Sequence, residues 1–389
     1  MVISGPARPQ CRRFPHQSTA AVTLTSAQII VLATPVFLAL IAVEWAVGRW
    51  RGRDTYRWPD AMASIGLGMV NQLVAVGTRL FGIGFYALVF EHLALQRLPV
   101  DAWWVWVGAL VGYDFLYYGY HRFGHRVALG WAAHAVHHQS EDYNLSTALR
   151  QTGTGFLTSW VFYLPLALAG VPPVVFGTVA LIDLLYQFWV HTQQVGKLGW
   201  FDRWFCSPSN HRVHHAVNDR YLDKNYGGIL IVWDRLFGTF AEEDDAEPCV
   251  YGTRSPLRSW NPVAANLQVY RELLSDSRRA TRWADRLRVW IEPPGWRPAD
   301  VAARWPKPAF ELARVERYDP PQQPVRLAAA VVLFVAALGV TSVLLWHVHR
   351  WPALQGLAVG LVVVALLVGV AWFTSAPRTA PRGAGAARA

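Results

Sequence analysis

Residues 327–373 read LAAAVVLFVAALGVTSVLLWHVHRWPALQGLAVGLVVVALLVGVAWF. The runs 327–346 and 354–373 are each long enough to cross the hydrocarbon core of a bilayer, about 30 Å thick, as a helix. A short polar turn containing His347 and His349 separates them. The stretch therefore predicts a pair of antiparallel transmembrane helices and makes an integral membrane protein the starting expectation.

The composition of the whole chain agrees with that expectation. Of 389 residues, 53% are hydrophobic and 16% are charged, whereas charged residues make up about a quarter of a soluble domain. A disordered tail, a collagen-like fibre, a disulfide scaffold and an ordinary soluble enzyme are excluded. The three cysteines form no CxxC pair and are expected to be reduced thiols.

The net charge of +10 comes from 36 basic residues, nearly all arginine. In an apolar chain this balance indicates positive cytoplasmic loops and contact with anionic headgroups. No arginine-rich tract or zinc-finger spacing favours nucleic acid as a partner. The richness in Arg and Ala favours a bacterial source, and hence the inner membrane.

Further apolar runs divide the chain into segments. An N-terminal tail, 1–21, precedes transmembrane helices within 22–119, expected at 24–47, 61–90 and 102–118. Residues 120–245 form a histidine-rich core that includes a hairpin at 155–190, where Gly170, Pro172 and Pro173 interrupt the apolar sequence. We expect this hairpin to be re-entrant, with two tilted spans as the alternative. A cytoplasmic amphipathic region, 246–325, the C-terminal pair, 326–373, and a disordered tail, 374–389, complete the prediction.

Within the amphipathic region, Trp283, Leu287, Trp290 and Ile291 repeat at helical spacing, with arginines between them. This pattern is typical of a helix that lies on a membrane surface. A helix packed on the surface of the cap is the alternative.

The histidines indicate the chemistry. Nine of the 13 fall within residues 121–215, where an even distribution would place about three. They form one HxxxH box, two HxxHH boxes and a single residue, namely His121 and His125; His134, His137 and His138; His211, His214 and His215; and His191. On a helix, residues three and four apart share a face, so each box directs its rings to common points.

A bound cation explains why so many imidazoles gather, because unpaired buried rings are costly to desolvate. One metal ion takes roughly four to six ligands, so nine candidates favour two ions. Imidazole suits zinc, copper, nickel and iron. Structural and hydrolytic zinc use three or four protein ligands, so the array favours a redox pair of irons that activates dioxygen, although spacing alone does not distinguish iron.

Outer residues that orient the rings are also predicted. Asp114 lies seven residues before His121, and Asp183 and Gln187 lie eight and four residues before His191, on the same helical faces. Carboxylates and amides in such positions commonly accept the second N–H of a metal-bound histidine. Asn210, directly before the last box, is a further candidate.

These boxes resemble the signature of the fatty acid hydroxylase superfamily, which includes sterol desaturases and lipid hydroxylases. The stretches HAVHHQSEDYNLSTALRQ (134–151) and SPSNHRVHHAVNDRYLDKNYGGILIVWDRLFGTF (207–240) are similar to the alkylglycerol monooxygenase branch and its bacterial members. The resemblance implies an all-α integral membrane protein, a multi-span bundle whose cytoplasmic helical cap holds a histidine-rich di-metal site. It places the ligand roles on His121, His125, His134, His137, His138, His191, His211, His214 and His215, with no catalytic residue beyond them.

The resemblance further implies two iron ions, dioxygen, a lipid substrate from the bilayer and an external electron donor, either a reductase or a reduced cofactor. The branch has Glu directly after its HxxxH box, whereas this chain has Arg126. Alkylglycerol ether cleavage and the use of tetrahydrobiopterin therefore stay open. Asn210 stands where some members of the superfamily have a histidine, which leaves open a replaced ligand.

The sequence thus predicts a lipid monooxygenase that hydroxylates a C–H bond. A desaturase or hydrolase at the same site is one alternative. A membrane protein that binds haem or a metal without catalysis is the other. The oligomeric state is left open.

Overall fold

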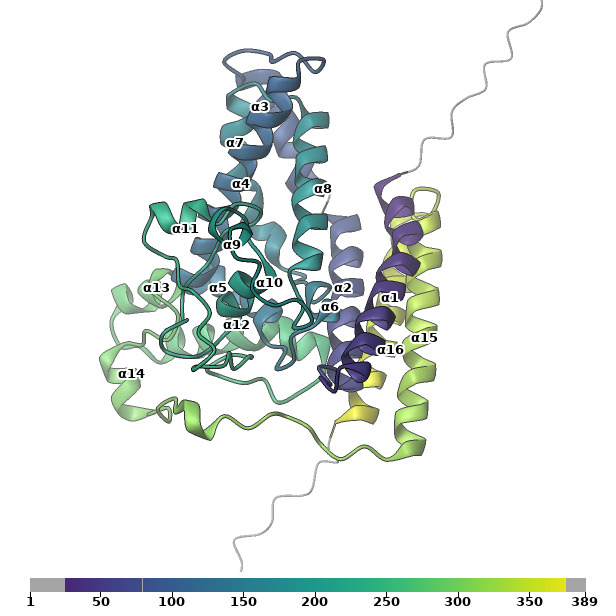
Figure 1. Ribbon diagram of the computed structural model, residues 1–389, viewed down its shortest axis with the longest axis vertical. Coiled ribbons are helices and arrows are strands. Elements are labelled where there is room, and N and C mark those ends of the chain that lie inside the picture. The colour runs from purple at the N-terminus through teal and green to yellow at the C-terminus, as the bar shows by residue number, and fades with distance from the viewer. Residues whose placement is uncertain (1–24, 79, 376–389) are drawn as a thin grey trace, which may run out of the picture.

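The computed structural model describes residues 25–78 and 80–375, and within these ranges it contains helices and no β-strand (Figure 1). The all-α prediction is confirmed. The predicted tail 1–21, Arg79 and residues 376–389 of the predicted C-terminal tail lie outside the described residues. The α-helices, in chain order, are α1 Ser26–Trp50, α2 Trp58–Gly77, α3 Phe85–Leu93, α4 Trp103–Arg126, α5 Ala128–His138, α6 Leu145–Ala148, α7 Ser159–Leu168, α8 Pro173–Trp189, α9 Phe201–Trp204, α10 Pro208–His214, α11 Val232–Leu236, α12 Pro262–Arg279, α13 Trp283–Ile291, α14 Ala299–Arg304, α15 Pro324–His347 and α16 Ala353–Thr374.

Among the described residues, the helices α1, α15 and α16 are long and apolar enough to cross a membrane, and the bent pair Trp58–Gly77 and Phe81–Leu93, taken as one span, would be a fourth. Helices α1, α15 and α16 stand side by side with α2 (Figure 1). Ala330 and Ala337 of α15 are completely buried against α2 and α16, because small side chains let helices approach closely. The outward faces carry exposed Val and Leu side chains, which suits contact with lipid. These features indicate a membrane protein, as the sequence predicts.

The apolar run 61–90 is not one continuous helix. Helix α2 ends at Gly77, a five-residue π-helical turn spans Leu80–Gly84, and α3 continues at an angle of 50°. Gly77, Gly82 and Gly84 surround the break, and glycine is a weak helix former. The segment is therefore a bent pair of helices, which hydropathy alone does not reveal.

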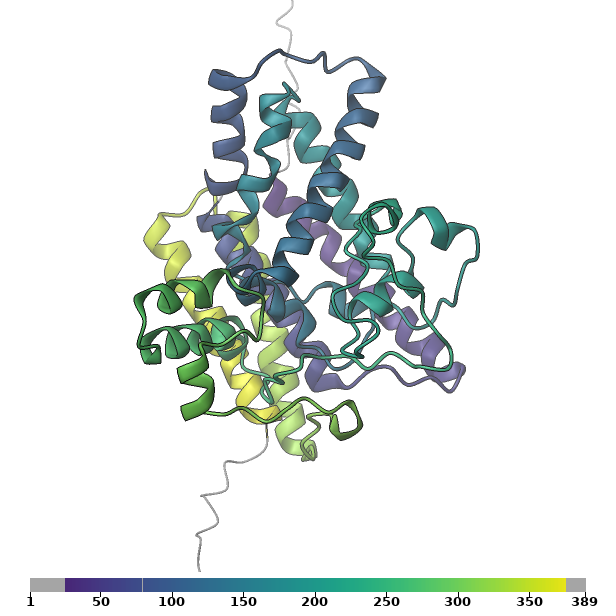
Figure 2. The same ribbon diagram turned by 90° about the vertical axis from the view of Figure 1, so that its left-hand side faces the viewer.

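Helices α3, α4, α7 and α8 form a second bundle. In Figure 2 the blue helices α3 and α4 stand on either side of the teal hairpin, and α7 and α8 pack against them. The hairpin reverses at Gly170, whose φ of +88° suits glycine. A Cβ atom at this position would lie 2.1 Å from the carbonyl oxygen of Gln96, so a larger residue does not fit. Helix α4 runs past the expected end at residue 118 to Arg126, so it carries the HxxxH box on its last turns.

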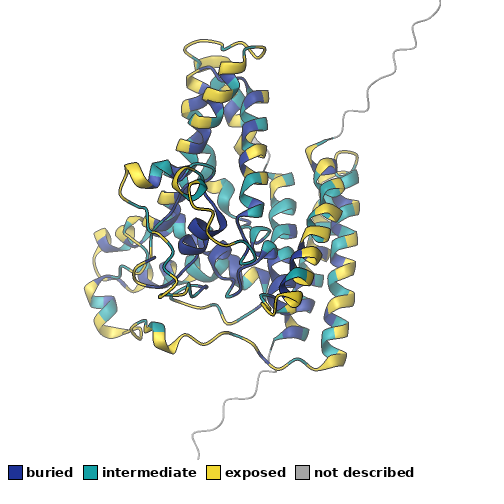
Figure 3. Ribbon diagram, in the orientation of Figure 1, coloured by how far each residue is buried: buried dark blue, intermediate teal, exposed yellow. Residues whose placement is uncertain are grey.

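The cap consists of the helices and loops between α4 and α7 and between α8 and α15. Ala128 and Ala132 of α5 pack against Leu273 of α12 and Val289 of α13. In Figure 3, many of the buried residues, coloured dark blue, lie in the region where α5 and α10 meet. The histidine boxes sit in this buried region, between the second bundle and the cap.

Candidate metal centre

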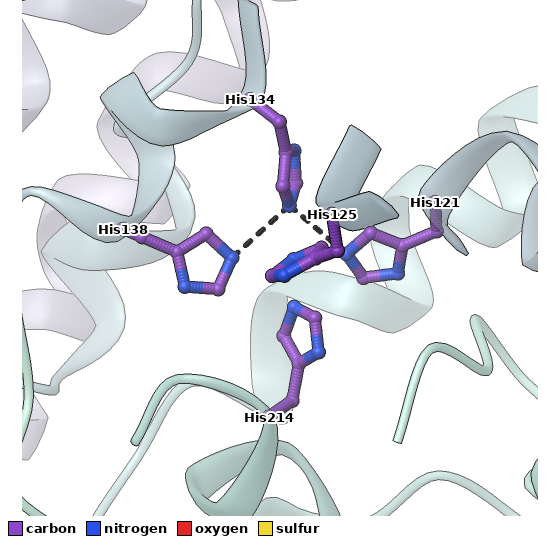
Figure 4. A group of neighbouring side chains, drawn as sticks. All are labelled: His121, His125, His134, His138 and His214. Carbon is purple, nitrogen blue, oxygen red and sulfur yellow. Dashed lines mark hydrogen bonds between the residues drawn. The ribbon is translucent and has the colours of Figure 1, made fainter. Parts of the chain in front are cut away.

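The nine histidines at 121–215 converge as two groups. The five-histidine group contains His121, His125, His134, His138 and His214, and the four-histidine group contains His137, His191, His211 and His215. In each group one nitrogen per ring lies within 4.8 Å of the corresponding nitrogens of the others. Figure 4 shows the rings of the five-histidine group pointing toward a common centre.

Helix geometry distributes the rings between the groups. Residues four apart share a face, so His134 and His138 of α5 enter the five-histidine group while His137 enters the other. The last box divides its rings the other way, with two in the four-histidine group and one in the five-histidine group. His211 and His215 enter the four-histidine group, and His214 enters the five-histidine group.

The closest approaches are between Nε2 atoms. In the five-histidine group, His134 lies 3.1 Å from His121 and 3.0 Å from His138. In the four-histidine group, His191 lies 3.2 Å from His137 and 3.1 Å from His211. Two imidazole nitrogens that bind one metal at right angles, each at about 2.1 Å, would be about 3 Å apart. The observed separations fit ligands of shared ions.

Hydrogen bonds made by the Nδ1 atoms show that the contact between His137 and His191 is not an ordinary hydrogen bond between two rings. His137 donates its Nδ1 proton to the carbonyl of Arg150 at 2.9 Å, and His191 donates its own to the carbonyl of Gln187 at 2.7 Å. In the neutral rings both Nε2 atoms are then unprotonated, so no hydrogen bond joins them. Two lone pairs 3.2 Å apart repel, and a cation between them removes the repulsion.

Protonation does not resolve the contact either. Burial lowers the pKa of His137 to about 4 and holds the pKa of His191 well below its usual value. In the five-histidine group, Nε2 of His125 and Nε2 of His214 are buried without a hydrogen-bond partner among the described residues. Neutral imidazoles with outward lone pairs are the donor set that transition metals prefer. The residues present therefore fit two metal ions.

Known proteins resemble the chain closely. The sequence profile "Fatty acid hydroxylase" matches residues 106–239, which include all nine histidines. Alkylglycerol monooxygenase of Danio rerio is 37% identical over 334 residues, covering 85% of this chain and 74% of the relative. The chain belongs to the fatty acid hydroxylase superfamily.

Two further relatives have higher and lower sequence identity to the chain. Human alkylglycerol monooxygenase is 40% identical over 268 residues, and the match covers 68% of this chain but only 59% of the human protein. Ornithine lipid hydroxylase OlsE of Rhizobium tropici is 26% identical over 220 residues, 54% of this chain and 66% of that protein. No solved structure matches the chain.

In this hydroxylase-family chain, Asp114 lies near the centre but does not bond a histidine ring. Its carboxylate accepts the backbone N–H groups of Ile229 and Leu230 at 2.6 and 3.1 Å and the indole N–H of Trp233 at 2.8 Å. The same loop carries the carbonyl of Tyr226, which accepts Nδ1–H of His121 at 2.8 Å. Asp114 thus holds a loop that orients a candidate ligand.

The side chains of the other three predicted outer residues form no hydrogen bond with a histidine ring either. Asp183 accepts the side-chain amide of Gln187 at 2.6 Å, and Gln187 accepts the hydroxyl of Tyr117 at 2.6 Å. The contact of Gln187 with His191 is made by its backbone carbonyl. Asn210 donates to the carbonyls of Asp202 and Phe205 and contacts no ring.

Sequence reasoning missed a second set of positioning residues. Arg150 is 1% exposed, and its guanidinium donates to the carbonyl of Val136 at 2.8 Å while its own carbonyl accepts from His137. Glu44 of α1 accepts the hydroxyls of Tyr56 and Thr192, and the latter follows His191 directly. A carboxylate within a span was the one signal available for Glu44, whereas no spacing marks Arg150.

A cavity of about 330 Å³ adjoins the centre. Its wall includes His125, His138, His214 and His215, together with apolar residues such as Trp131 and Val269 and charged residues such as Arg254 and Glu272. Pockets of a few hundred Å³ with mostly apolar walls are typical of small-molecule sites. The cavity therefore gives a small molecule or part of a lipid access to the five-histidine group.

Proposed function

We propose that the protein is a di-iron monooxygenase that inserts oxygen into a C–H bond of a membrane lipid. The observation that carries the proposal is the pair of histidine groups, in which Nε2 atoms face each other at about 3 Å and those of His137 and His191 are both unprotonated. Membership of the fatty acid hydroxylase superfamily supports iron over zinc, copper and nickel. The five-histidine group would hold one ion and the four-histidine group the other.

Bound iron would supply the activation of dioxygen and the oxidation of the C–H bond. The chain supplies orientation. The carbonyls of Tyr226, Lys224, Arg150 and Gln187 accept the Nδ1–H of His121, His214, His137 and His191, respectively. These bonds fix each tautomer and aim Nε2 inward. These four rings are nearly completely buried, which limits the water around them.

The substrate that we propose is an ether lipid of the alkylglycerol type, because four relatives from different animals carry the name alkylglycerol monooxygenase. Hydroxylation of the carbon next to an ether oxygen gives a hemiacetal, which breaks into an aldehyde and an alcohol. The apolar sides of the cavity would hold the alkyl chain beside the five-histidine group. The ornithine lipid relative shows that the superfamily also includes hydroxylases named for another lipid.

The balance of the reaction requires an electron donor. One dioxygen, two electrons and two protons give the hydroxylated lipid and one water. We propose that a separate reductase or a reduced cofactor such as tetrahydrobiopterin supplies the two electrons.

We place the centre on the cytoplasmic side. Arg49 lies in the last turn of α1, and Arg51 and Arg53 follow the helix. Arg51 donates to the carbonyl of Gln194, three residues after His191. The arginine-rich end of the first span therefore lies on the side of the candidate centre, and such loops usually face the cytoplasm. For the bacterial source that the composition favours, the membrane would be the inner membrane.

The test combines metal content with labelled dioxygen. Protein purified after expression with ample iron should contain about two irons per chain, and incubation with an alkylglycerol, a reductant and isotopically labelled dioxygen should place label in the product. His211→Ala serves as the metal-poor control. Zinc alone at full occupancy would contradict the proposal, and an unlabelled alkene product would indicate desaturation instead.

A further inference from the structure

The outward face of α13 is an exposed apolar stripe. Trp283, Leu287 and Ile291 are 73%, 66% and 65% exposed. They lie four residues apart, so they share one face of the helix. Large apolar side chains gathered in this way usually mark a surface that another phase or molecule covers.

The opposite face fixes the helix to the cap. Asp285 and Val289 are buried, and Val289 packs against Leu273 of α12. Trp290, which the sequence places with the apolar residues, is only partly exposed and joins this packing. The stripe is therefore held in place as part of a packed helix.

Arginines surround the stripe. Five of them, Arg278, Arg279, Arg282, Arg286 and Arg288, fall between residues 278 and 291, where the single acidic residue is the buried Asp285. The side chains of Arg278, Arg279 and Arg282 are exposed and form no ion pair with residues 25–78 or 80–375. This face of the cap therefore presents positive charge around an apolar centre.

The position of α13 relative to the spans favours one occupant. Helix α12, on which α13 packs, also contacts α2 and the span α16. Ala265 of α12 shares a buried cluster with Leu67 of α2. The stripe is thus one helix away from the membrane-embedded bundle.

We propose that α13 lies in the headgroup layer of an anionic bilayer leaflet. Trp283, Leu287 and Ile291 enter the boundary of the acyl chains, and the arginines bind lipid phosphates. Amphipathic helices with tryptophan on one side and arginine on the other bind membranes in this way. Pro293, Pro294 and Trp296, which follow α13 directly, line the cavity beside the histidines. The mouth of that cavity then lies at the lipid surface. The proposal concerns the placement of the cap and does not depend on the reaction.

Spin labels in full-length protein test the placement. In a background with Cys11→Ser and Cys249→Ser (Cys206 is completely buried), single cysteines are introduced by Leu287→Cys, Leu361→Cys and Asp245→Cys. Leu361 is an exposed residue of the span α16 and serves as the lipid reference. Asp245, with a side chain 90% exposed, serves as the water reference. Collision rates with dioxygen and with a water-soluble nickel chelate are compared in nanodiscs that contain an anionic phospholipid.

The label at residue 287 should collide more often with dioxygen than with nickel, as at residue 361. Adding Arg278→Glu and Arg282→Glu should shift it toward the ratio at residue 245, whereas Arg220→Glu, an exposed site elsewhere, should not. If the label at residue 287, without the arginine substitutions, gave the same ratio of dioxygen to nickel collisions as the label at residue 245, the proposal would be overturned. Low collision rates with both reagents would also overturn it and would indicate a protein surface, such as a second copy of the chain.

Discussion

His137 and His138 are adjacent in the chain, yet their rings belong to different groups, and His214 and His215 repeat this division. One turn of helix places two ligands in one group, and the neighbouring residue reaches the other. In α5 and in the last box, neighbouring residues therefore contribute to different candidate ion positions.

Variants of the two groups should lose different ions. His134→Ala and His138→Ala each remove a ring from the five-histidine group, and His211→Ala and His215→Ala remove one from the other. Each should lower the metal content by about one ion per chain and abolish lipid oxidation. Metal analysis of purified protein provides the measurement. His349→Ala, distant from both groups, is the control, and an unchanged metal content in all four variants would exclude these ligand roles.

Arg150→Met should destabilise the protein. Arg150 is completely buried, lies 3.8 Å from the buried carboxylate of Asp60 and donates to the carbonyl of Val136. Its loss leaves the carbonyl of Val136 without its donor and leaves Asp60 with Arg57 as its remaining cation, at a cost of about 3 kcal/mol. Thermal unfolding measures the effect. Adding Asp60→Asn should recover part of the loss, and equal stability of the single and double variants would argue against the pairing.

Gly228→Ala should disturb the outer residues of the centre. A Cβ at this position would lie 2.6 Å from Oδ1 of Asp183 and 3.0 Å from Oδ1 of Asp114. Because both carboxylates are held by hydrogen bonds, we expect a loss of about 1–3 kcal/mol in stability and weaker metal retention. Gly196→Ala, where the Cβ would meet no atom within 4 Å, is the matched control. Melting temperature and metal content of the two variants decide the matter.

Filling the cavity should block the lipid without removing metal. Val269 of α12 lines the cavity, whereas Val263 of the same helix is exposed and does not. Val269→Trp should lower kcat/KM for the lipid by about tenfold or more, with full metal content, and Val263→Trp should leave both unchanged. If Val269→Trp keeps full activity, the substrate reaches the centre by another route.

The sequence predicts the helical class, the three long apolar helices α1, α15 and α16 and the gathering of the histidines because each depends on local pattern. Spacing of four residues already places two rings of each box on one face of a helix and in one group. The partition into five and four depends on how α4, α5 and α10 are oriented in space, and no local pattern contains that information. The break near Gly82 was likewise hidden, because an apolar run has the same hydropathy whether it is straight or bent.

The outer residues show the same limit. Helical register predicts Asp114 on the side of His121, but its partners, Ile229, Leu230 and Trp233, come from a segment more than a hundred residues away. Arg150 stabilises α5 through a backbone carbonyl, and a backbone acceptor leaves no mark in the sequence.

Burial lowers the pKa of all nine rings that converge on the centre, and neither group includes a carboxylate. Two divalent ions held there would keep their entire positive charge in surroundings with little water to screen it. Such a setting disfavours raising the oxidation state of the ions further, so the reduction potential of this pair should lie above that of a pair held by acidic side chains. A comparatively weak reductant would then suffice to return the centre to its ferrous form.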